Sequence, residues 1–130
     1  MGDHIKLLQE VSNEELPSLY RLATLTVQPS FYEGFGLPPL EAMSSGCPVI
    51  ASHAASLPEV CGDASMYFDP HSPEEMAAKI ESVMDNTGSC KEALIQKGYE
   101  RIKNFCWKKT ASRHLDIFKR LLFDENSTCL

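Results

Sequence analysis

Residues 24–52 decide the fold of this chain, and they read TLTVQPSFYEGFGLPPLEAMSSGCPVIAS. The run 24–28 is rich in β-branched residues and the run 48–52 is apolar, so both are predicted strands. The run 48–52 lacks alternation, which is typical of a parallel strand buried on both faces. Between them, a loop leads into a helix that opens with Leu37-Pro38-Pro39 and that Gly46 can close, because proline suits a first helical turn and glycine a C-cap. The segment therefore predicts a strand–helix–strand unit of a parallel sheet.

The residues before this unit predict a short strand at 5–8 and a helix. Ser12 is expected to be the N-cap and Glu15 to complete a capping box. Pro17 is late for a first turn, so an irregular helix start is expected. The apolar spacing predicts that this helix buries Leu16, Leu19, Tyr20 and Ala23.

The residues after the unit predict a helical turn at 56–60 and a last strand at 66–68. Ser72-Pro73-Glu74-Glu75 forms a second capping box, and the helix that it opens has an apolar stripe of Met76, Ile80, Val83 and Met84. Two more helices are expected at 92–104 and 108–123, the last burying Ala111, Leu115, Phe118 and Leu122. Alternating strands and helices predict an α/β fold, with a parallel sheet layered between helices.

The composition narrows the class of protein. The chain has 130 residues and a net charge of −6. This length fits one domain or part of a larger one, and the acidic balance argues against nucleic acid as a partner. Nine of the twelve basic residues lie within 91–120. A solvated basic face is the simpler interpretation of that cluster, and peripheral contact with an anionic membrane is the alternative.

The cysteines and the apolar runs indicate the compartment. The five cysteines, Cys47, Cys61, Cys90, Cys106 and Cys129, are odd in number and without C-x-x-C spacing, so neither a disulfide framework nor a zinc site is expected. No apolar run is long enough for a membrane span, and no signal peptide opens the sequence. A cytoplasmic protein with reduced thiols is the expectation.

The loop 30–36 and the helix after it hold the residues suited to chemistry. Ligands of parallel α/β sheets bind beyond the carboxyl ends of strands, and helix N-termini attract phosphate. Gly34 and Gly36 would let the backbone approach a ligand closely. The carboxylates of Glu33 and Glu41 can each accept hydrogen bonds from paired hydroxyls, as in a sugar and a ribose. The same residues also suit an ordinary loop whose glutamates only complement the helix dipole.

The run from Pro29 to Met43, followed by Ser45 to Ser52, resembles the donor-binding motif of glycosyltransferase family 4, in which seven residues separate two glutamates. The likeness extends to Val11–Leu16 with Leu19-Tyr20, to Leu57–Val60 and to the region of Trp107. It covers nearly the whole chain.

This resemblance implies the GT-B architecture, in which two Rossmann-like domains face each other across a cleft. It implies retaining transfer of a sugar from a UDP-, GDP- or ADP-sugar, without a metal or another cofactor. Glu33 would act at the reaction centre, and the donor would be bound by Ser30, Gly34, Phe35, Gly36, Leu37 and Glu41. Glu41 would hold the ribose.

The departures from the family pattern limit what residues 1–130 are expected to do. The sequence lacks the family's earlier βα units with their Arg and Lys pair, and also the acceptor domain with its histidine; neither Arg21 nor any histidine here takes those places. The chain is thus interpreted as the donor-binding part of a GT-B glycosyltransferase, truncated on its N-terminal side, with 107–124 as a crossover helix and little activity alone. The acceptor, a glycan or a lipid carrier, would bind the missing domain. The alternative is a non-catalytic module or partner subunit that binds nucleotide sugars.

Overall fold

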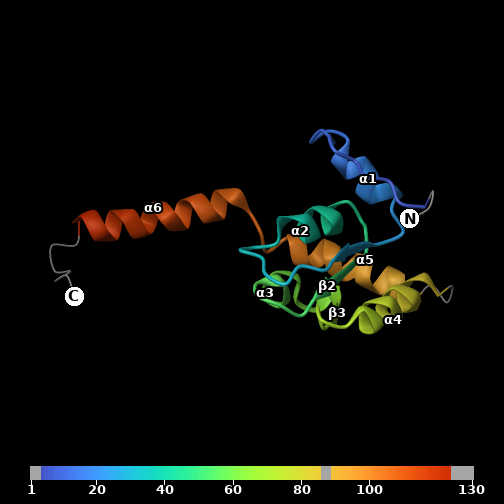
Figure 1. The fold of residues 1–130 in the computed structure, drawn as a ribbon. Coiled ribbons are helices and arrows are strands. Elements are labelled where there is room, and N and C mark those ends of the chain that lie inside the picture. Colours follow the sequence, from blue (N-terminus) through green and yellow to red (C-terminus); the bar gives the residue numbers. More distant parts are fainter. Residues whose placement is uncertain (1–3, 86–88, 124–130) are drawn as a thin grey trace.

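A computed structural model describes residues 4–85 and 89–123 of the chain (Figure 1). Three parallel strands form its sheet in the order β1-β2-β3. They are β1 (Thr26–Gln28), β2 (Val49–Ser52) and β3 (Ser65–Phe68). In the register, Val27 is opposite Ile50, and Ile50 is opposite Met66. The predicted parallel α/β sheet is therefore confirmed.

Helices cover both faces of this sheet. In chain order they are α1 (Leu16–Leu22), α2 (Leu37–Ser44), α3 (Leu57–Cys61), the 3-10 turn η1 (Gly62–Ala64), α4 (Pro73–Met84), α5 (Ser89–Ile102) and α6 (Trp107–Phe123). All four residues of β2 are buried, as predicted for its unbroken apolar run. Val49 and Ala51 pack with α2 and α3, whereas Ile50 packs on the other face with α4 and α5. Each face therefore has its own apolar cluster.

The ends of α2 follow from its sequence. Gly36 is the N-cap, and the two prolines occupy the first turn, as expected. After the helix, Gly46 takes a φ of +77°, its N–H donates to the carbonyl of Met43, and the N–H of Cys47 donates to the carbonyl of Ala42. These two bonds form a Schellman motif, so Gly46 closes the helix as predicted.

Both predicted capping boxes are present, with one difference. Ser12 and Glu15 bond each other's backbone N–H groups, at 3.1 and 3.2 Å, before the delayed start of α1. Ser72 accepts from the N–H of Glu75, but the Glu75 carboxylate accepts from the N–H of Asp69 instead. The second box thus fastens the end of β3 to the start of α4.

Four predictions about burial and pairing are wrong. The strand predicted at 5–8 is absent, and Ile5, Leu7 and Leu8 are exposed. Among the described strands, β1 pairs with β2 and none pairs with this segment. Helix α1 buries no residue: it packs mainly on α2, so Leu16 and Tyr20 are half-buried while Leu19 and Ala23 are exposed. Met84, placed in the apolar stripe of α4, is exposed.

The fourth wrong prediction concerns α6, which buries none of its residues, Ala111, Leu115, Phe118 and Leu122 included. Figure 1 shows α6 extending away from the body, so no described element covers its apolar face (Figure 1). Within the residues that the structure describes, no helix is both long and apolar enough to cross a membrane.

Candidate functional site

Glu33 is held in place by polar side chains at the end of β1. Its Oε1 accepts a hydrogen bond from Gln28 Nε2 and another from Ser30 Oγ, each at 2.8 Å. Gln28 Nε2 also donates to Ser30 Oγ at 2.8 Å, so the three side chains form one network. Among the described residues, none bonds the second oxygen, Oε2. The network thus fixes a half-buried carboxylate and leaves one of its oxygens for a ligand.

Two serine hydroxyls form hydrogen bonds with backbone carbonyls of the loop 30–36. Ser52, the last residue of β2, donates from Oγ to the carbonyl of Ser30. Ser56 Oγ, just before α3, lies 3.0 Å from the carbonyl of Glu33 and 2.7 Å from that of Phe35. Carbonyl groups of the loop therefore point into the body, where they have partners.

The backbone N–H groups of residues 34–37 differ from these carbonyls. No acceptor among the described residues bonds any of these four groups. The next two residues, Pro38 and Pro39, have no N–H at all, so the free donors of the α2 N-terminus are confined to this short run. A run of unpaired N–H groups at a helix N-terminus suits a phosphate or another anion.

The two glycines of the loop differ in their surroundings. Gly36 has a φ of +111°, and a Cβ built there would lie 3.0 Å from Leu57 Cδ2, so backbone strain and packing both require glycine. At Gly34, a Cβ would meet nothing within 4 Å. The protein itself thus explains the glycine at 36, and a ligand close to the backbone would explain the one at 34.

Glu41 lies one turn into α2 and is exposed. The Tyr20 hydroxyl of α1 donates to its Oε2 at a long 3.5 Å. Burial, and then the charge of Glu41, raise the pKa of Tyr20, so this hydroxyl stays protonated as a donor. Glu41 therefore keeps most of its acceptor capacity for a ligand.

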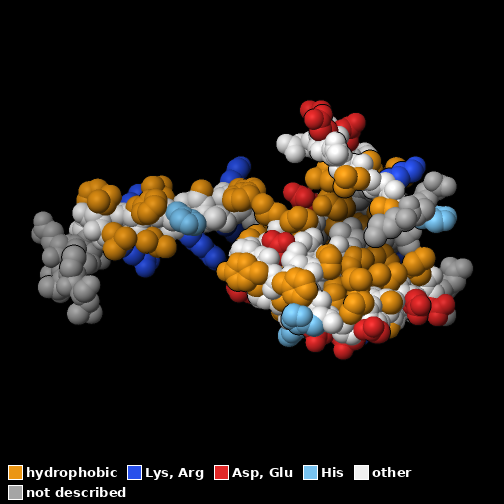
Figure 2. Space-filling view, in the orientation of Figure 1, with side chains coloured by type: hydrophobic (Ala, Val, Ile, Leu, Met, Phe, Trp, Pro, Cys, Tyr) orange, Lys and Arg blue, Asp and Glu red, His pale blue; other side chains and the backbone are white. Residues whose placement is uncertain are grey.

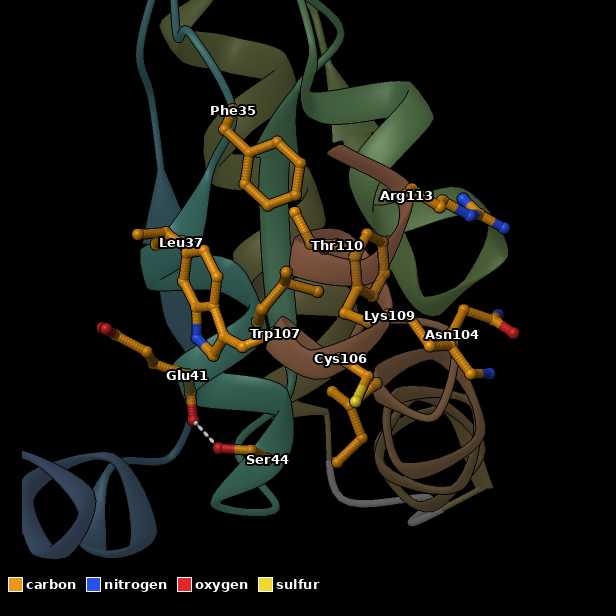
Figure 3. A pocket seen from close by; sticks show the side chains of 13 residues that line it. Phe35, Leu37, Glu41, Ser44, Asn104, Cys106, Trp107, Lys109, Thr110 and Arg113 are labelled. Carbon is orange, nitrogen blue, oxygen red and sulfur yellow. Dashed lines mark hydrogen bonds between the residues drawn. The ribbon is translucent and has the colours of Figure 1, made fainter. Parts of the chain in front are cut away.

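A hollow of about 720 Å³ lies between the start of α2 and the start of α6 (Figure 3). Phe35, Leu37 and Glu41 line it, and Trp107 contributes its indole, which points to the same side as Leu37 and Glu41 in Figure 3. Arg113 extends away from Glu41 at the other end (Figure 3). A second hollow, of about 320 Å³, lies on the other side of Glu41 and is lined in part by Asn13, Pro17 and Tyr20 of the α1 region.

The structure brings together only some of the predicted residues. Phe35, Leu37 and Glu41 share the larger hollow, whereas Ser30, Glu33, Gly34 and Gly36 do not line it and form the loop beside it. Trp107 is 78% exposed, so it is not part of the core of the described residues. Phe105, Lys109 and Arg113 also line the hollow but were not predicted, because nothing in their spacing relates them to residues 30–41. Arg21 and the four histidines are exposed.

Comparison with known proteins gives a consistent family. The family model of the group 1 glycosyl transferases matches residues 1–101. O-antigen chain mannosyltransferase B of Escherichia coli is 43% identical over 118 residues, which are 90% of this chain and 30% of that protein. The MMP alpha-(1->4)-mannosyltransferase of Mycolicibacterium hassiacum is 31% identical over 126 residues, 94% of this chain and 30% of that protein.

A solved structure extends the likeness to the fold. Sucrose-phosphate synthase from Thermosynechococcus elongatus aligns with a TM-score of 0.83 and 28% identity, over 93% of this chain and 31% of that one. The chain thus spans less than a third of the length of these relatives. Its three-stranded parallel sheet and helices match a portion of a GT-B glycosyltransferase domain. By its sequence and its fold, this chain belongs to the group 1 glycosyltransferases, known also as glycosyltransferase family 4.

Proposed function

We propose that this chain is the donor-binding part of a retaining glycosyltransferase that uses a nucleoside diphosphate sugar. The observation that carries the proposal is the run of four N–H groups at residues 34–37, which find no acceptor in the described part of the chain and are flanked by two carboxylates that keep acceptor capacity. Such a loop offers donors to a diphosphate and acceptors to the hydroxyls on either side of it.

Each residue has a role in this proposal. Glu41 accepts hydrogen bonds from the ribose hydroxyls. The N–H groups of Gly34, Phe35, Gly36 and Leu37 bind the diphosphate, and Glu33 binds the sugar at the reaction centre. Ser30 holds Glu33 through its 2.8 Å hydrogen bond. The diphosphate leaves as an anion, so donors that are already in place stabilise it without a proton transfer. The proposed reaction uses no metal and no further cofactor.

The activity of a whole enzyme is a second step of the proposal. Two of the relatives above are mannosyltransferases, so mannose is the first sugar to test. The acceptor, a glycan or a lipid carrier, would bind a second domain. Helix α6 would cross over to that domain, where the apolar face of α6 would be covered. The proposed compartment is the cytoplasm, where thiols stay reduced, and Cys47, Cys61, Cys90 and Cys106 form no disulfide.

Calorimetric titration tests the donor site. UDP, GDP, ADP and their glucose and mannose conjugates would be titrated into the chain in the presence of EDTA. Glu41→Ala is expected to weaken binding of the preferred nucleotide by about 1–3 kcal/mol, because the ribose hydroxyls lose their acceptor. Glu33→Ala is expected to bind the nucleotide sugar no more tightly than the bare nucleotide.

The matched control is Glu81→Ala, which removes an exposed carboxylate from α4, on the opposite face of the sheet from α2. It should bind every ligand as the unchanged chain does. An equal loss in Glu81→Ala and Glu41→Ala would show a general charge effect and contradict the ribose role. Binding that matches the proposal while no transfer occurs, even with the second domain supplied, would favour the alternative of a non-catalytic nucleotide-sugar-binding module.

A further inference from the structure

Phe35 is the residue between the two loop glycines, and it is 46% exposed. The rings of Phe35 and Phe105 form a T-shaped pair, with the centroids 5.9 Å apart and the planes at 83°. Edge-to-face pairs of this kind are favourable beyond the area that they bury. Phe105 lies in the short connection between α5 and α6, 70 positions further along the chain.

Arg101, at the end of α5, packs its guanidinium over the ring of Phe105. Its guanidinium carbon lies 5.4 Å from the centre of the Phe105 ring. The same guanidinium donates from Nε to the carbonyl of Val60 at 2.9 Å, and from Nη2 to the carbonyl of Glu59. These carbonyls lie in the last turn of α3, where a cation is favoured by the helix dipole. Arg101 therefore bonds α3 and stacks on Phe105 at once.

The close fit at this point depends on Gly62. A Cβ at Gly62 would lie 3.2 Å from the guanidinium carbon of Arg101, so a side chain there would push the arginine away. Helix α3 itself lies under the loop, with Leu57 against Gly36 and the preceding Ser56 bonded to the carbonyls of Glu33 and Phe35. The loop thus contacts the α3 region through Ser56 and Leu57, and it contacts Phe105 through Phe35. Arg101 connects the two, because it bonds α3 and lies against the Phe105 ring.

We infer that Arg101 and Phe105 are positioning residues, which set the place of the Phe35–Gly36 segment and thereby the geometry of the unpaired N–H groups. Neither residue needs to touch the donor for this. A donor gains from N–H groups that are already in place, because ordering them on binding would cost conformational entropy. The inference rests on the proposed donor site for its functional meaning, but its structural half can be tested without any ligand.

The first test reads the loop directly. Amide signals of Gly34 and Gly36 would be followed by ¹⁵N NMR in the full chain and in Phe105→Leu, Phe105→Tyr and Arg101→Lys. Leu keeps the apolar bulk without a ring and Lys keeps the charge without a fork, so both variants are expected to shift or broaden these signals. Tyr keeps the ring and should restore them.

The control is Leu94→Ala, which removes a buried side chain of α5 that packs on the other face of the sheet. It is expected to lower the melting temperature while leaving the Gly34 and Gly36 signals in place. Unchanged glycine signals in Phe105→Leu would overturn the inference. Equal changes in Leu94→Ala would overturn it too, because the effect would then be general loosening.

The second test reads binding, with GDP-mannose and UDP-glucose in the calorimeter. Phe105→Leu is expected to weaken binding about threefold to tenfold, with Phe105→Tyr close to the unchanged chain. If Phe105 acts through Phe35, the double variant Phe35→Leu/Phe105→Leu should lose no more affinity for the nucleotide sugar than the single variant with the larger loss. Fully additive losses would overturn the coupling. If the unchanged chain binds no nucleotide sugar, the proposed function has failed, and the glycine signals still decide whether Arg101 and Phe105 position the loop.

Discussion

Helices α2 and α6 both have apolar faces, but only α2 buries its own. Pro39, Leu40, Ala42 and Met43 make half of the eight residues of α2 and are all buried. Helix α6 is twice as long and buries none, although Leu115, Phe118 and Leu122 recur at spacings of three and four and share one face. In Figure 2 the hydrophobic side chains of α6 lie open along its length, among basic ones (Figure 2).

The difference shows what an amphipathic pattern determines. Periodicity predicts that a helix forms and which side is apolar. It does not determine whether another element covers that side. In the sequence, α2 connects β1 and β2, which pair with each other. This connection brings the apolar face of α2 onto the sheet. Helix α6 has no strand after it among the described residues.

Replacement of Met43 should give the largest effect and sharpen this comparison. Met43 is 2% exposed in the cluster between α2 and the sheet, so Met43→Ala is expected to cost about 2–5 kcal/mol of unfolding free energy. Leu115→Ala on α6, where the side chain is 53% exposed, should stay within about 0.5 kcal/mol. Urea unfolding followed by circular dichroism measures both. Comparable losses would mean that α6 is covered in solution.

The loop glycines extend the comparison into the site. Gly36→Ala is expected to cost about 1–3 kcal/mol of stability, since alanine is strained at a φ of +111° and its Cβ would crowd Leu57. Gly34→Ala should change stability by less than about 0.5 kcal/mol, because its Cβ meets open space. Gly34→Ala should nevertheless weaken nucleotide-sugar binding, because the new Cβ would occupy space beside the N–H groups that are proposed to bind the diphosphate. A Gly34→Ala chain that binds as well as the unchanged chain would remove the ligand-based reason for this glycine.

Much of the fold was predictable, because local chemistry and packing agree in residues 24–52. The unbroken apolar run of β2 and the prolines and glycines around α2 each identify one element, and the structure has each where the pattern indicates. The segment 5–8 failed because a strand is defined by its neighbour, which no property of Ile5, Leu7 or Leu8 supplies. The burial predicted for α1 failed for a related reason: among the described elements α1 packs mainly on α2, and this contact leaves its side chains half-buried or exposed.

The candidate site divides in the same way. Glu33 and Glu41 were accessible to sequence reasoning, because the motif places both on one loop and helix. The residues that hold this loop and helix were harder to predict. Gln28 and Ser30 are near Glu33 in sequence, but Ser52 and Ser56, which bond carbonyls of the loop, and Tyr20, which bonds Glu41, reach the site only through the strand register and helix packing. Arg101 and Phe105 are more distant still, and no spacing relates them to the loop.

A smaller effect is expected from the surface of α6. Replacing both Leu115 and Leu122 with serine should leave the urea midpoint almost unchanged, because both side chains are exposed. It should reduce binding of the dye ANS and any self-association seen by sedimentation, since contiguous exposed apolar surface promotes both. Arg120→Ala, a change on the polar side of the same helix, is the control and should alter neither. A double variant that unfolds at clearly lower urea would contradict the exposed position of α6.

The thiols give the last contrast, with no expected change in stability. Cys106 lies immediately before α6 and is exposed, and the backbone N–H groups of Lys109 and then Lys108 hold its pKa below the usual thiol value. In the body, burial raises the pKa of Cys47, and raises that of Cys61 to about 11. The thiolate is the form that reacts, so a lowered pKa means faster alkylation at a given pH, and a raised pKa means slower.

Maleimide labelling at pH 7, mapped by mass spectrometry, should therefore modify Cys106 well before Cys47 and Cys61. The rate at Cys106 should level off at a lower pH than the rate at a free cysteine, because its titration is complete sooner. A Cys129→Ser background removes the thiol that lies outside the described residues. In urea the differences should vanish, since both the helix N-terminus and the burial are lost. If Cys47 or Cys61 reacted as fast as Cys106 in the folded chain, these two thiols would not be protected by burial. The contrast between the sheet region and α6 would then fail.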